Sequence, residues 1–185
     1  MGISVDWDRF AFTLDETRSK AVTEAFVRMY EKKLIYRASR LVNWSSSLHT
    51  ALSDIEVEYI ELDGPTDLVI PGHDPKQKYT FGELTKFSYK VKGTDRIMIV
   101  ATTRLETMLG DVAVAVHPQD PRYNDLIGKE LEHPFCKDRS MKIIADDVLV
   151  DMNFGTGAVK ITPAHDPNDF NCGKRHGLEQ ITVIN

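Results

Sequence analysis

The sequence has few cysteines, no long apolar run and no excess of positive charge, and each shortage argues against a class of protein. Its two cysteines, Cys136 and Cys172, lie far apart and outside any CxxC pair, which argues against a disulfide framework and a cysteine-rich zinc site. No apolar run approaches the roughly 20 residues of a membrane-spanning helix, and the N-terminus lacks the features of a signal peptide. The net charge of −5 argues against a broad nucleic-acid surface but leaves room for a local pocket that takes a single strand end.

The remaining composition is typical of a folded domain. The chain has 185 residues, of which 42% are hydrophobic and 28% charged, enough for one domain with a real core. We expect a protein without a membrane partner in a reducing compartment. The cytoplasm is the predicted location, and the mitochondrion is the alternative for a longer parent enzyme.

One amphipathic helix is predicted near the N-terminus. Thr13 and Glu16 have the spacing of a capping box, and the pattern predicts a helix from about Leu14 to Lys33. Its apolar stripe is expected to pack in a core and consists of Val22, Ala25, Phe26, Met29 and Tyr30.

The rest of the chain is rich in short strands that are mostly separated by loops rather than helices. This pattern favours an α+β fold with a closed or strongly bent sheet over a doubly wound sheet. The predicted strands are Ile55–Ile60, Leu68–Ile70, Phe87–Val91, Ile97–Thr102, Val112–Val116, Ile143–Val150, Ala158–Thr162 and Ile181–Ile184.

The stretch from Gly155 to Gly177 predicts a strand, a sharp turn and a helix. Asp166 suits the helix N-cap and Pro167 the first helical position, and Asp169 stands three residues after the cap, as in a capping box. Gly177 suits the residue that stops the helix. The first turn of this helix should therefore bring two carboxylates to the mouth of a site.

Two clusters of polar side chains are candidates for that site. In the first, Lys160 and Thr162 share one face of a strand that precedes the helix, although the two aspartates could serve only as helix caps. Its members are Lys160, Thr162, His165, Asp166 and Asp169. The second cluster places hydroxyls around a guanidinium after a buried strand, and such groups bind sugar hydroxyls, carboxylates or phosphates. Its members are Thr102, Thr103, Arg104 and Thr107.

Two other interpretations of these residues are weaker. Gly155, Gly157 and Lys160 resemble a phosphate-binding glycine loop, but such loops open a helix, whereas these glycines open a strand. A metal site could use His117, His165, Asp166 and Asp169, but they lack a closed spacing such as HExxH.

At these residues the chain resembles the editing domain of the valyl-tRNA synthetases. The matching stretches are LVNW at 41–44, ALSDIEVEY at 51–59, TTRLETMLGDVAVAVHP at 102–118, GTGAVKITPAHDPNDF at 155–170 and GKRHGL at 173–178. The resemblance implies a β-barrel-like α+β editing domain of the valyl, isoleucyl and leucyl type, with flanking helices, inserted into a class I catalytic core. The HIGH and KMSKS signatures of that core are absent here. Residues 1–40 would then be a lead-in from the catalytic body, and 41–185 the editing domain, shortened at its C-terminus.

Two positions depart from the family pattern. Many relatives carry a cysteine pair after LVNW that forms a zinc knuckle, but Ser45, Ser46 and Ser47 stand there in this chain, so we predict no zinc. The signature arginine is commonly followed by proline, and Leu105 here makes the loop after Arg104 less constrained.

The resemblance also implies a reaction and a role for each candidate. A valyl enzyme's hydrophobic pocket is known to reject threonine by only about a hundredfold, so a second site must hydrolyse Thr-tRNA(Val) by recognising the threonine hydroxyl. By analogy Asp169 would bind the substrate ammonium, and Asp166 or Lys160, beside Thr162, the hydroxyl. The ester and the terminal ribose would be held by Thr102, Thr103, Arg104 and Thr107, with His165 nearby and Phe154 as a wall.

No metal or cofactor is expected, because hydrolysis of an activated ester needs only a positioned water and a stabilised oxyanion. The implied partners are the 3′ end of tRNA(Val) carrying threonine and the remainder of the synthetase, and the isolated domain should be a monomer. Two rival functions stay open: a metal-dependent hydrolase, and a non-catalytic module that binds tRNA ends. Which group orients the water is also open.

Overall fold

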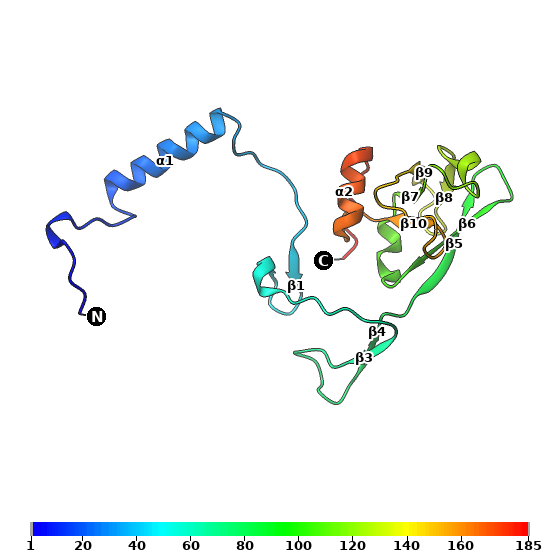
Figure 1. The fold of residues 1–185 in the computed structure, drawn as a ribbon, viewed down its shortest axis with the longest axis horizontal. Coiled ribbons are helices and arrows are strands. Elements are labelled where there is room, and N and C mark those ends of the chain that lie inside the picture. The colour runs from blue at the N-terminus through cyan, green and yellow to red at the C-terminus, as the bar shows by residue number, and fades with distance from the viewer. Residues whose placement is uncertain (1, 185) are drawn as a thin grey trace. The chain divides into compact units, whose positions relative to one another are not determined.

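The computed structural model describes residues 2–184 and divides into two compact units, Met1–Arg40 and Leu41–Asn185 (Figure 1). The first unit holds a short 3-10 helix, η1 (Trp7–Arg9), and the helix α1 (Glu16–Glu31). The N-cap of α1 is Asp15, whose side chain accepts from the backbone N–H of Arg18. The predicted capping box at Thr13 is therefore wrong, because an aspartate two residues later caps the helix instead.

Helix α1 buries none of its residues. Phe26 and Tyr30 of the predicted stripe are each more than half exposed. The predicted core packing of this stripe is thus wrong for the part of the chain that the structure describes. Helix α1 is stabilised instead by its N-cap and by two ion pairs, Glu16–Lys20 and Glu24–Arg28. The two residues of each pair are four positions apart and lie on the same side of the helix.

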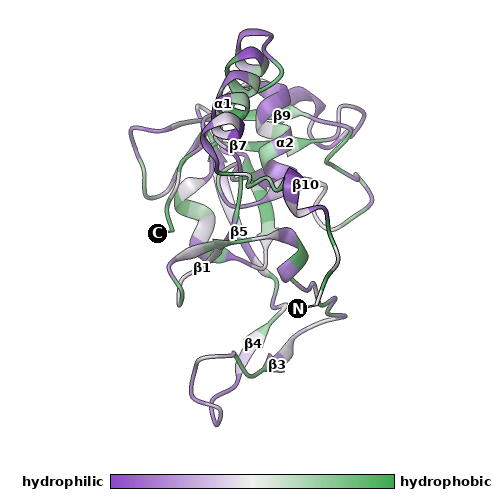
Figure 2. Cartoon of the chain, turned by 90° about the vertical axis from the view of Figure 1, so that its left-hand side faces the viewer, coloured by the Kyte–Doolittle hydropathy of each residue, from purple (hydrophilic) through white to green (hydrophobic). Residues whose placement is uncertain are grey.

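The second unit begins with two small antiparallel sheets. Strands β1 (Asn43–Ser45) and β2 (Thr50–Leu52) form one, and β3 (Thr66–Leu68) and β4 (Tyr79–Phe81) form the other. The loop that joins β3 and β4 is hydrophilic (purple in Figure 2). The sequence predicted a strand at Leu68–Ile70, and the observed strand β3 begins and ends two residues earlier.

The strand predicted at Ile55–Ile60 is wrong. A short 3-10 helix, η2 (Asp54–Glu56), starts there, and the Glu56 carboxylate accepts from the backbone N–H of Ser53. The alternating apolar residues have no sheet to cover, and Ile55 is 95% exposed. Alternation alone does not form a strand where no partner strand is available.

The main element is a six-stranded sheet in the order β10-β7-β9-β8-β5-β6. Its two edge strands, β10 and β6, contact each other without a hydrogen-bonded ladder, so the sheet curls into a nearly closed barrel. We call this contact the open seam. The predicted α+β, barrel-like fold is confirmed. The strands are β5 (Thr85–Val91), β6 (Ile97–Thr102), β7 (Ala113–Val116), β8 (Glu130–Glu132), β9 (Ser140–Ala145) and β10 (Ala158–Ile161).

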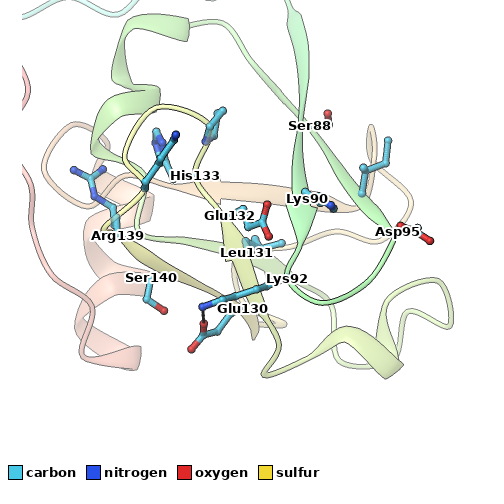
Figure 3. Close-up of a pocket in the computed structure, with 13 residues that line it drawn as sticks. Ser88, Lys90, Lys92, Asp95, Glu130, Leu131, Glu132, His133, Arg139 and Ser140 are labelled. Carbon is cyan, nitrogen blue, oxygen red and sulfur yellow. Dashed lines mark hydrogen bonds and ion pairs between the residues drawn. The ribbon is translucent and has the colours of Figure 1, made fainter.

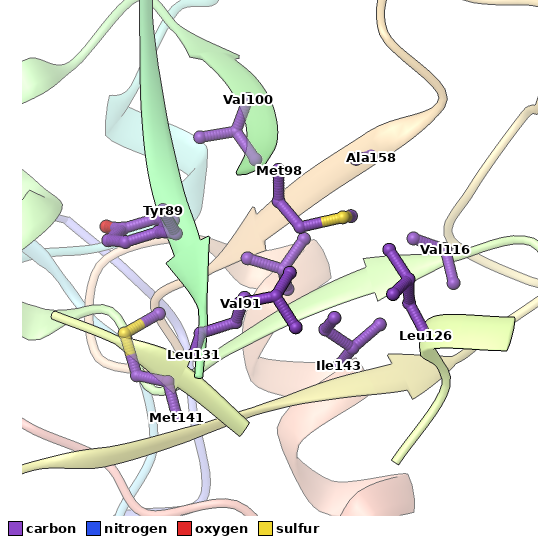
Figure 4. Packing of buried hydrophobic residues seen from close by; sticks show 11 residues of the cluster. Tyr89, Val91, Met98, Val100, Val116, Leu126, Leu131, Met141, Ile143 and Ala158 are labelled. Atoms are coloured by element: carbon purple, nitrogen blue, oxygen red, sulfur yellow. The ribbon is translucent and has the colours of Figure 1, made fainter. Parts of the chain in front are cut away.

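The barrel core is formed by side chains from all six strands of the sheet and by Leu126 (Figure 4). Each fully buried aliphatic or aromatic side chain contributes about 1.5–3 kcal/mol by its removal from water. Two 3-10 helices, η3 (Leu105–Gly110) and η4 (Asn124–Leu126), and the helix α2 (Pro167–His176) complete the unit. The buried cluster consists of Tyr89, Val91, Met98, Val100, Val114, Val116, Leu126, Leu131, Met141, Ile143 and Ala158.

Two predicted strands near the end of the chain differ from the structure. Strand β9 stops at Ala145 because the side chain of Asp146 accepts from the backbone N–H of Leu149 and turns the chain. Residues 181–184 form no strand, since Val183 donates its N–H to the His165 ring rather than to a ladder.

Candidate functional site

Helix α2 starts and ends at the residues that the sequence predicts. The Asp166 carboxylate is the N-cap and accepts from the backbone N–H groups of Asn168 and Asp169 through the same oxygen, Oδ1. Pro167 occupies the first turn, and Gly177 ends the helix with a φ of 63°, which glycine adopts without strain. These local signals fix where Asp166 and Asp169 stand at the helix start.

The other end of α2 is held by the buried carboxylate of Asp146. Arg175 donates to both of its oxygens, at 2.9 and 2.8 Å, and the His176 ring lies 2.9 Å away. Burial favours the neutral acid, but hydrogen bonds from Arg175, the Leu149 amide and His176 outweigh it and lower the pKa of Asp146 to about 2. Asp146, with Cys172 and His176, is the one group among residues 2–184 with metal-ligand spacing. Since Arg175 already occupies both carboxylate oxygens, this cluster is better explained as an anchor for the helix.

A pocket of about 340 Å³ lies where the open seam meets the start of α2. Ala101 and Thr102 of β6 line one side, and Val159 and Lys160 of β10 the other. The pocket brings together both polar clusters of the sequence, although they are more than fifty residues apart. The predicted site residues that line it are Thr102, Thr103, Arg104, Thr107, Lys160, Thr162, His165, Asp166 and Asp169.

A buried polar network forms the floor of this pocket. The Lys160 ammonium donates to Thr107 Oγ1 at 2.9 Å, to Asp111 Oδ1 at 3.0 Å and to Thr162 Oγ1 at 2.6 Å. Asp111, which is fully buried, also accepts from the hydroxyls of Thr162 and Tyr89. An ammonium has three N–H bonds, so all three of Lys160 are used inside the protein.

Asp169 presents one free carboxylate oxygen to the pocket. Its Oδ2 accepts from the backbone N–H of Thr162 at 2.8 Å, while Oδ1 has no hydrogen-bond partner among residues 2–184. Asp169 is therefore not the second half of a capping box, because it faces the barrel instead of the N-cap amide. Burial raises the pKa of Asp169 to about 7. Such a carboxylate is suited to bind a cation that enters the pocket.

Arg104 and His165 connect the two sides of the pocket. Arg104 donates from Nη1 to the backbone oxygen of His165 at 3.1 Å and from Nε to Glu106 at 3.3 Å. The His165 ring accepts from the Val183 amide through Nε2, and burial, then Arg104, then Lys160, lower its pKa. These two contacts orient the Arg104 guanidinium even though Leu105, and not a proline, follows it.

Two residues considered at the sequence level lie elsewhere. Phe154, the expected wall, is 81% exposed in the loop before β10 and does not line the pocket. His117, the first ligand of the alternative metal set, accepts from the Gln119 amide and is also absent from the lining. Asp111 was missed because an aspartate after glycine and before a strand has the pattern of an ordinary turn.

A second, larger hollow of about 620 Å³ lies on the outer face of β5 and β8 (Figure 3). It mixes both signs of charge, and Lys92 and Glu130 neutralise each other at 2.8 Å. Because charges of both signs line this hollow, its residues indicate no particular ligand, whereas the pocket at the seam presents the free oxygen of Asp169.

Comparisons with known proteins identify the family of this chain. Residues 1–169 match the family model of class I tRNA synthetases for isoleucine, leucine, methionine and valine. The chain belongs to this family. It is 58% identical to a valine–tRNA ligase of Schizosaccharomyces pombe over 184 residues, and 59% identical to one of Homo sapiens over 186 residues. Each alignment covers 100% of this chain but only 18% and 14% of the relatives, so the chain spans less than a fifth of their length.

A further relative and one solved structure also align with this chain. A relative from Saccharomyces cerevisiae, 56% identical over 100% of this chain and 16% of its own, is named a mitochondrial valine–tRNA ligase. A crystal structure of a ternary LeuRS–tRNA–LeuAMS complex from Agrobacterium radiobacter K84 aligns with a TM-score of 0.44 and 19% identity, covering 92% of this chain and 29% of that one. The valine–tRNA ligase relatives confirm the resemblance of the sequence to the valyl-tRNA synthetases. In residues 2–184 of this family member, no helix has the length and apolar character to cross a membrane.

Proposed function

We propose that this chain is the editing domain of a valyl-tRNA synthetase and hydrolyses threonine from mischarged Thr-tRNA(Val). The observation that carries the proposal is the pocket at the open seam, where a buried carboxylate, Asp169, keeps one oxygen free beside hydroxyl and guanidinium groups. The similarity of the whole chain to valine–tRNA ligases supports this assignment.

The contacts of the pocket suggest a role for each group. Asp169 pairs its free oxygen with the α-ammonium of the substrate. Asp166 caps the helix through Oδ1, which leaves Oδ2 to accept from the threonine hydroxyl. Lys160 is the weaker candidate for this role, because its three N–H bonds are already used. Thr102, Thr103 and Arg104, at the pocket rim, hold the ester and the terminal ribose.

Hydrolysis then requires the addition of water to the ester carbonyl and the release of the ribose oxygen. The tetrahedral intermediate carries an oxyanion, which hydroxyl or guanidinium donors at the rim stabilise. The carbon–oxygen bond to the ribose then breaks. One proton of the water ends on the ribose oxygen, and the other passes to solvent because threonine leaves as a carboxylate. Neither cysteine takes part: Cys172 is buried in the middle of α2 against Asp146, and neither it nor Cys136 lines the pocket.

The domain assignment is part of this proposal. Residues 1–40 would be a lead-in from the catalytic body, and 41–185 the editing domain, with the remainder of the synthetase and the 3′ end of tRNA(Val) as partners. The isolated chain would be a monomer.

The direct test is to incubate the full chain with Thr-tRNA(Val) and with Val-tRNA(Val) and to follow loss of the aminoacyl group. We expect the threonyl ester to be hydrolysed and the valyl ester to persist. Binding without hydrolysis of either ester would favour the non-catalytic tRNA-end module.

Removal of metal ions is expected to leave deacylation unchanged. The pocket offers carboxylates on one helix turn but no set of ligands with the spacing that a catalytic metal needs among the described residues. The measurement compares the deacylation rate before and after dialysis against EDTA, followed by addition of zinc. A loss on dialysis that zinc restores would support the metal-dependent hydrolase instead.

Deacylation is expected to rise with pH through about 7. Burial raises the pKa of Asp169 to about 7, and only its charged form can pair with the substrate ammonium. An Asp169→Asn variant should lose this limb of the pH–rate profile. A parental profile without an inflection between pH 6 and 8 would contradict the assignment.

The same pKa predicts the pH dependence of stability. Because the folded pKa of Asp169 lies above that of the unfolded chain, its favourable contribution is complete below about 4 and is lost as the pH rises through about 7. The Tm of Asp169→Asn relative to the parent should therefore be higher at pH 8 than at pH 5. If the difference in Tm between Asp169→Asn and the parent is the same at pH 5 and at pH 8, the pKa of Asp169 is not raised by folding.

A further inference from the structure

Asp111 is the most buried charge next to the pocket, and no part of the proposed reaction yet uses it. It follows η3 directly, its exposure is 0%, and each of its carboxylate oxygens has a donor. Oδ1 accepts from the Lys160 ammonium and the Thr162 hydroxyl, and Oδ2 accepts from the Tyr89 hydroxyl at 2.6 Å. A buried carboxylate with three donors is held in a single position.

The same network leads to Asp169 in two steps. The Thr162 hydroxyl bonds to Asp111, and the Thr162 backbone N–H bonds to Asp169 Oδ2 at 2.8 Å. Lys160 is held by Asp111 and Thr162 together. Asp111 thus fixes the strand end whose amide orients the carboxylate that faces the pocket.

We propose that Asp111 is a positioning residue of this pocket, which holds Lys160 and Thr162 in place and, through the Thr162 amide, aims Asp169 at its ligand. This inference rests on the proposed editing function, in which the ligand is an aminoacyl ammonium. Asp111 itself belongs to the buried network and does not line the pocket, so in this proposal it does not touch the substrate.

Charge also connects the two aspartates. The charged groups that act on Asp169 are Lys160 from β10, Asp111 after η3 and Asp166 from its own helix. Lys160 favours the charged form of Asp169, whereas the two carboxylates disfavour it. The other titratable side chains that line the pocket are Arg104, which is exposed to solvent, and His165.

The test is Asp111→Asn in the full chain, with Asp120→Asn as the matched control. Asp120 is another buried aspartate, but its partner is Arg122 and it does not line the pocket. In Asp111→Asn we expect deacylation of Thr-tRNA(Val) to fall about 100-fold, the loss typical of a misplaced reacting group. The midpoint of Asp169, followed by NMR of its carboxyl carbon, should move to lower pH because a neighbouring negative charge is gone. Asp120→Asn should keep the parental rate and midpoint.

A parental rate and an unmoved Asp169 midpoint in Asp111→Asn would overturn the inference. If the parent itself deacylates nothing, the proposed function fails, and the Asp169 midpoint still decides whether Asp111 acts on the pocket.

A second variant covers the case in which Asp111→Asn does not fold. Tyr89→Phe removes one hydrogen bond from Asp111 and leaves its charge, so deacylation should fall roughly fivefold. Tyr123→Phe is its control, because the Tyr123 hydroxyl donates to the backbone of Thr156, away from the pocket. Equal rates in the two tyrosine variants would also overturn the inference.

Discussion

Replacement of Asp169 by asparagine is expected to reduce deacylation of Thr-tRNA(Val) by roughly 30-fold or more. Loss of one partner from a desolvated charge pair costs about 2–5 kcal/mol, and each 1.4 kcal/mol is a factor of ten in rate. Asparagine keeps the shape of the side chain and an oxygen that can accept from the Thr162 amide, so the fold should persist. The measurement is the single-turnover rate at pH 8, where the parental carboxylate is charged.

Asp151→Asn is the control for this substitution. Asp151 accepts from the Asn153 amide in an exposed loop and does not line the pocket. Its variant should keep the parental rate. A folded Asp169→Asn protein that hydrolyses Thr-tRNA(Val) as fast as the parent would remove Asp169 from the reaction.

The second large effect concerns the choice between threonine and valine. Sites built to hydrogen-bond a hydroxyl can reject the analogue that lacks it by a factor on the order of 10⁴, since buried polar groups are then left unpaired. We therefore expect Thr-tRNA(Val) to be deacylated faster than Val-tRNA(Val) by a factor on the order of 10⁴. Valine fits the same space but offers no donor to Asp166.

Asp166→Asn should narrow this ratio by at least about tenfold, through slower removal of threonine. Asparagine caps helices as well as aspartate does, so the start of α2 should be preserved. Lys160→Met provides the contrast: it leaves the Asp111 carboxylate buried without its cation and should destabilise the fold. If Asp166→Asn keeps the parental ratio of deacylation rates, a group other than Asp166 recognises the threonine hydroxyl.

Features that depend on neighbouring residues could be predicted from the sequence. The cap at Asp166, the stop at Gly177 and the apolar run of β6 each rest on contacts within a few residues. The two polar clusters could also be predicted, because each lies on or just after a strand that the pattern predicts. The strand pattern favoured a closed or strongly bent sheet, but it did not indicate which strands meet at the seam, so the meeting of the two clusters in one pocket did not follow from it.

Features that depend on distant partners could not be predicted. The Asp146–Arg175 ion pair joins residues 29 positions apart, and Asp111 meets Lys160 across 49. Neither aspartate differs from a turn residue by its local pattern. The strand predicted at Ile55–Ile60 is wrong for the opposite reason: its alternation is a local pattern, but a strand also needs a distant partner strand.

The open seam has a consequence for how such a domain diversifies. The pocket walls belong to β6 and β10, and among the described residues no ladder joins these two strands. Exchanges of side chains at Ala101 or Val159 can therefore widen or narrow the pocket without loss of a backbone hydrogen bond. One barrel can in this way form pockets of different width, while the hydrogen-bonded part of the sheet stays unchanged.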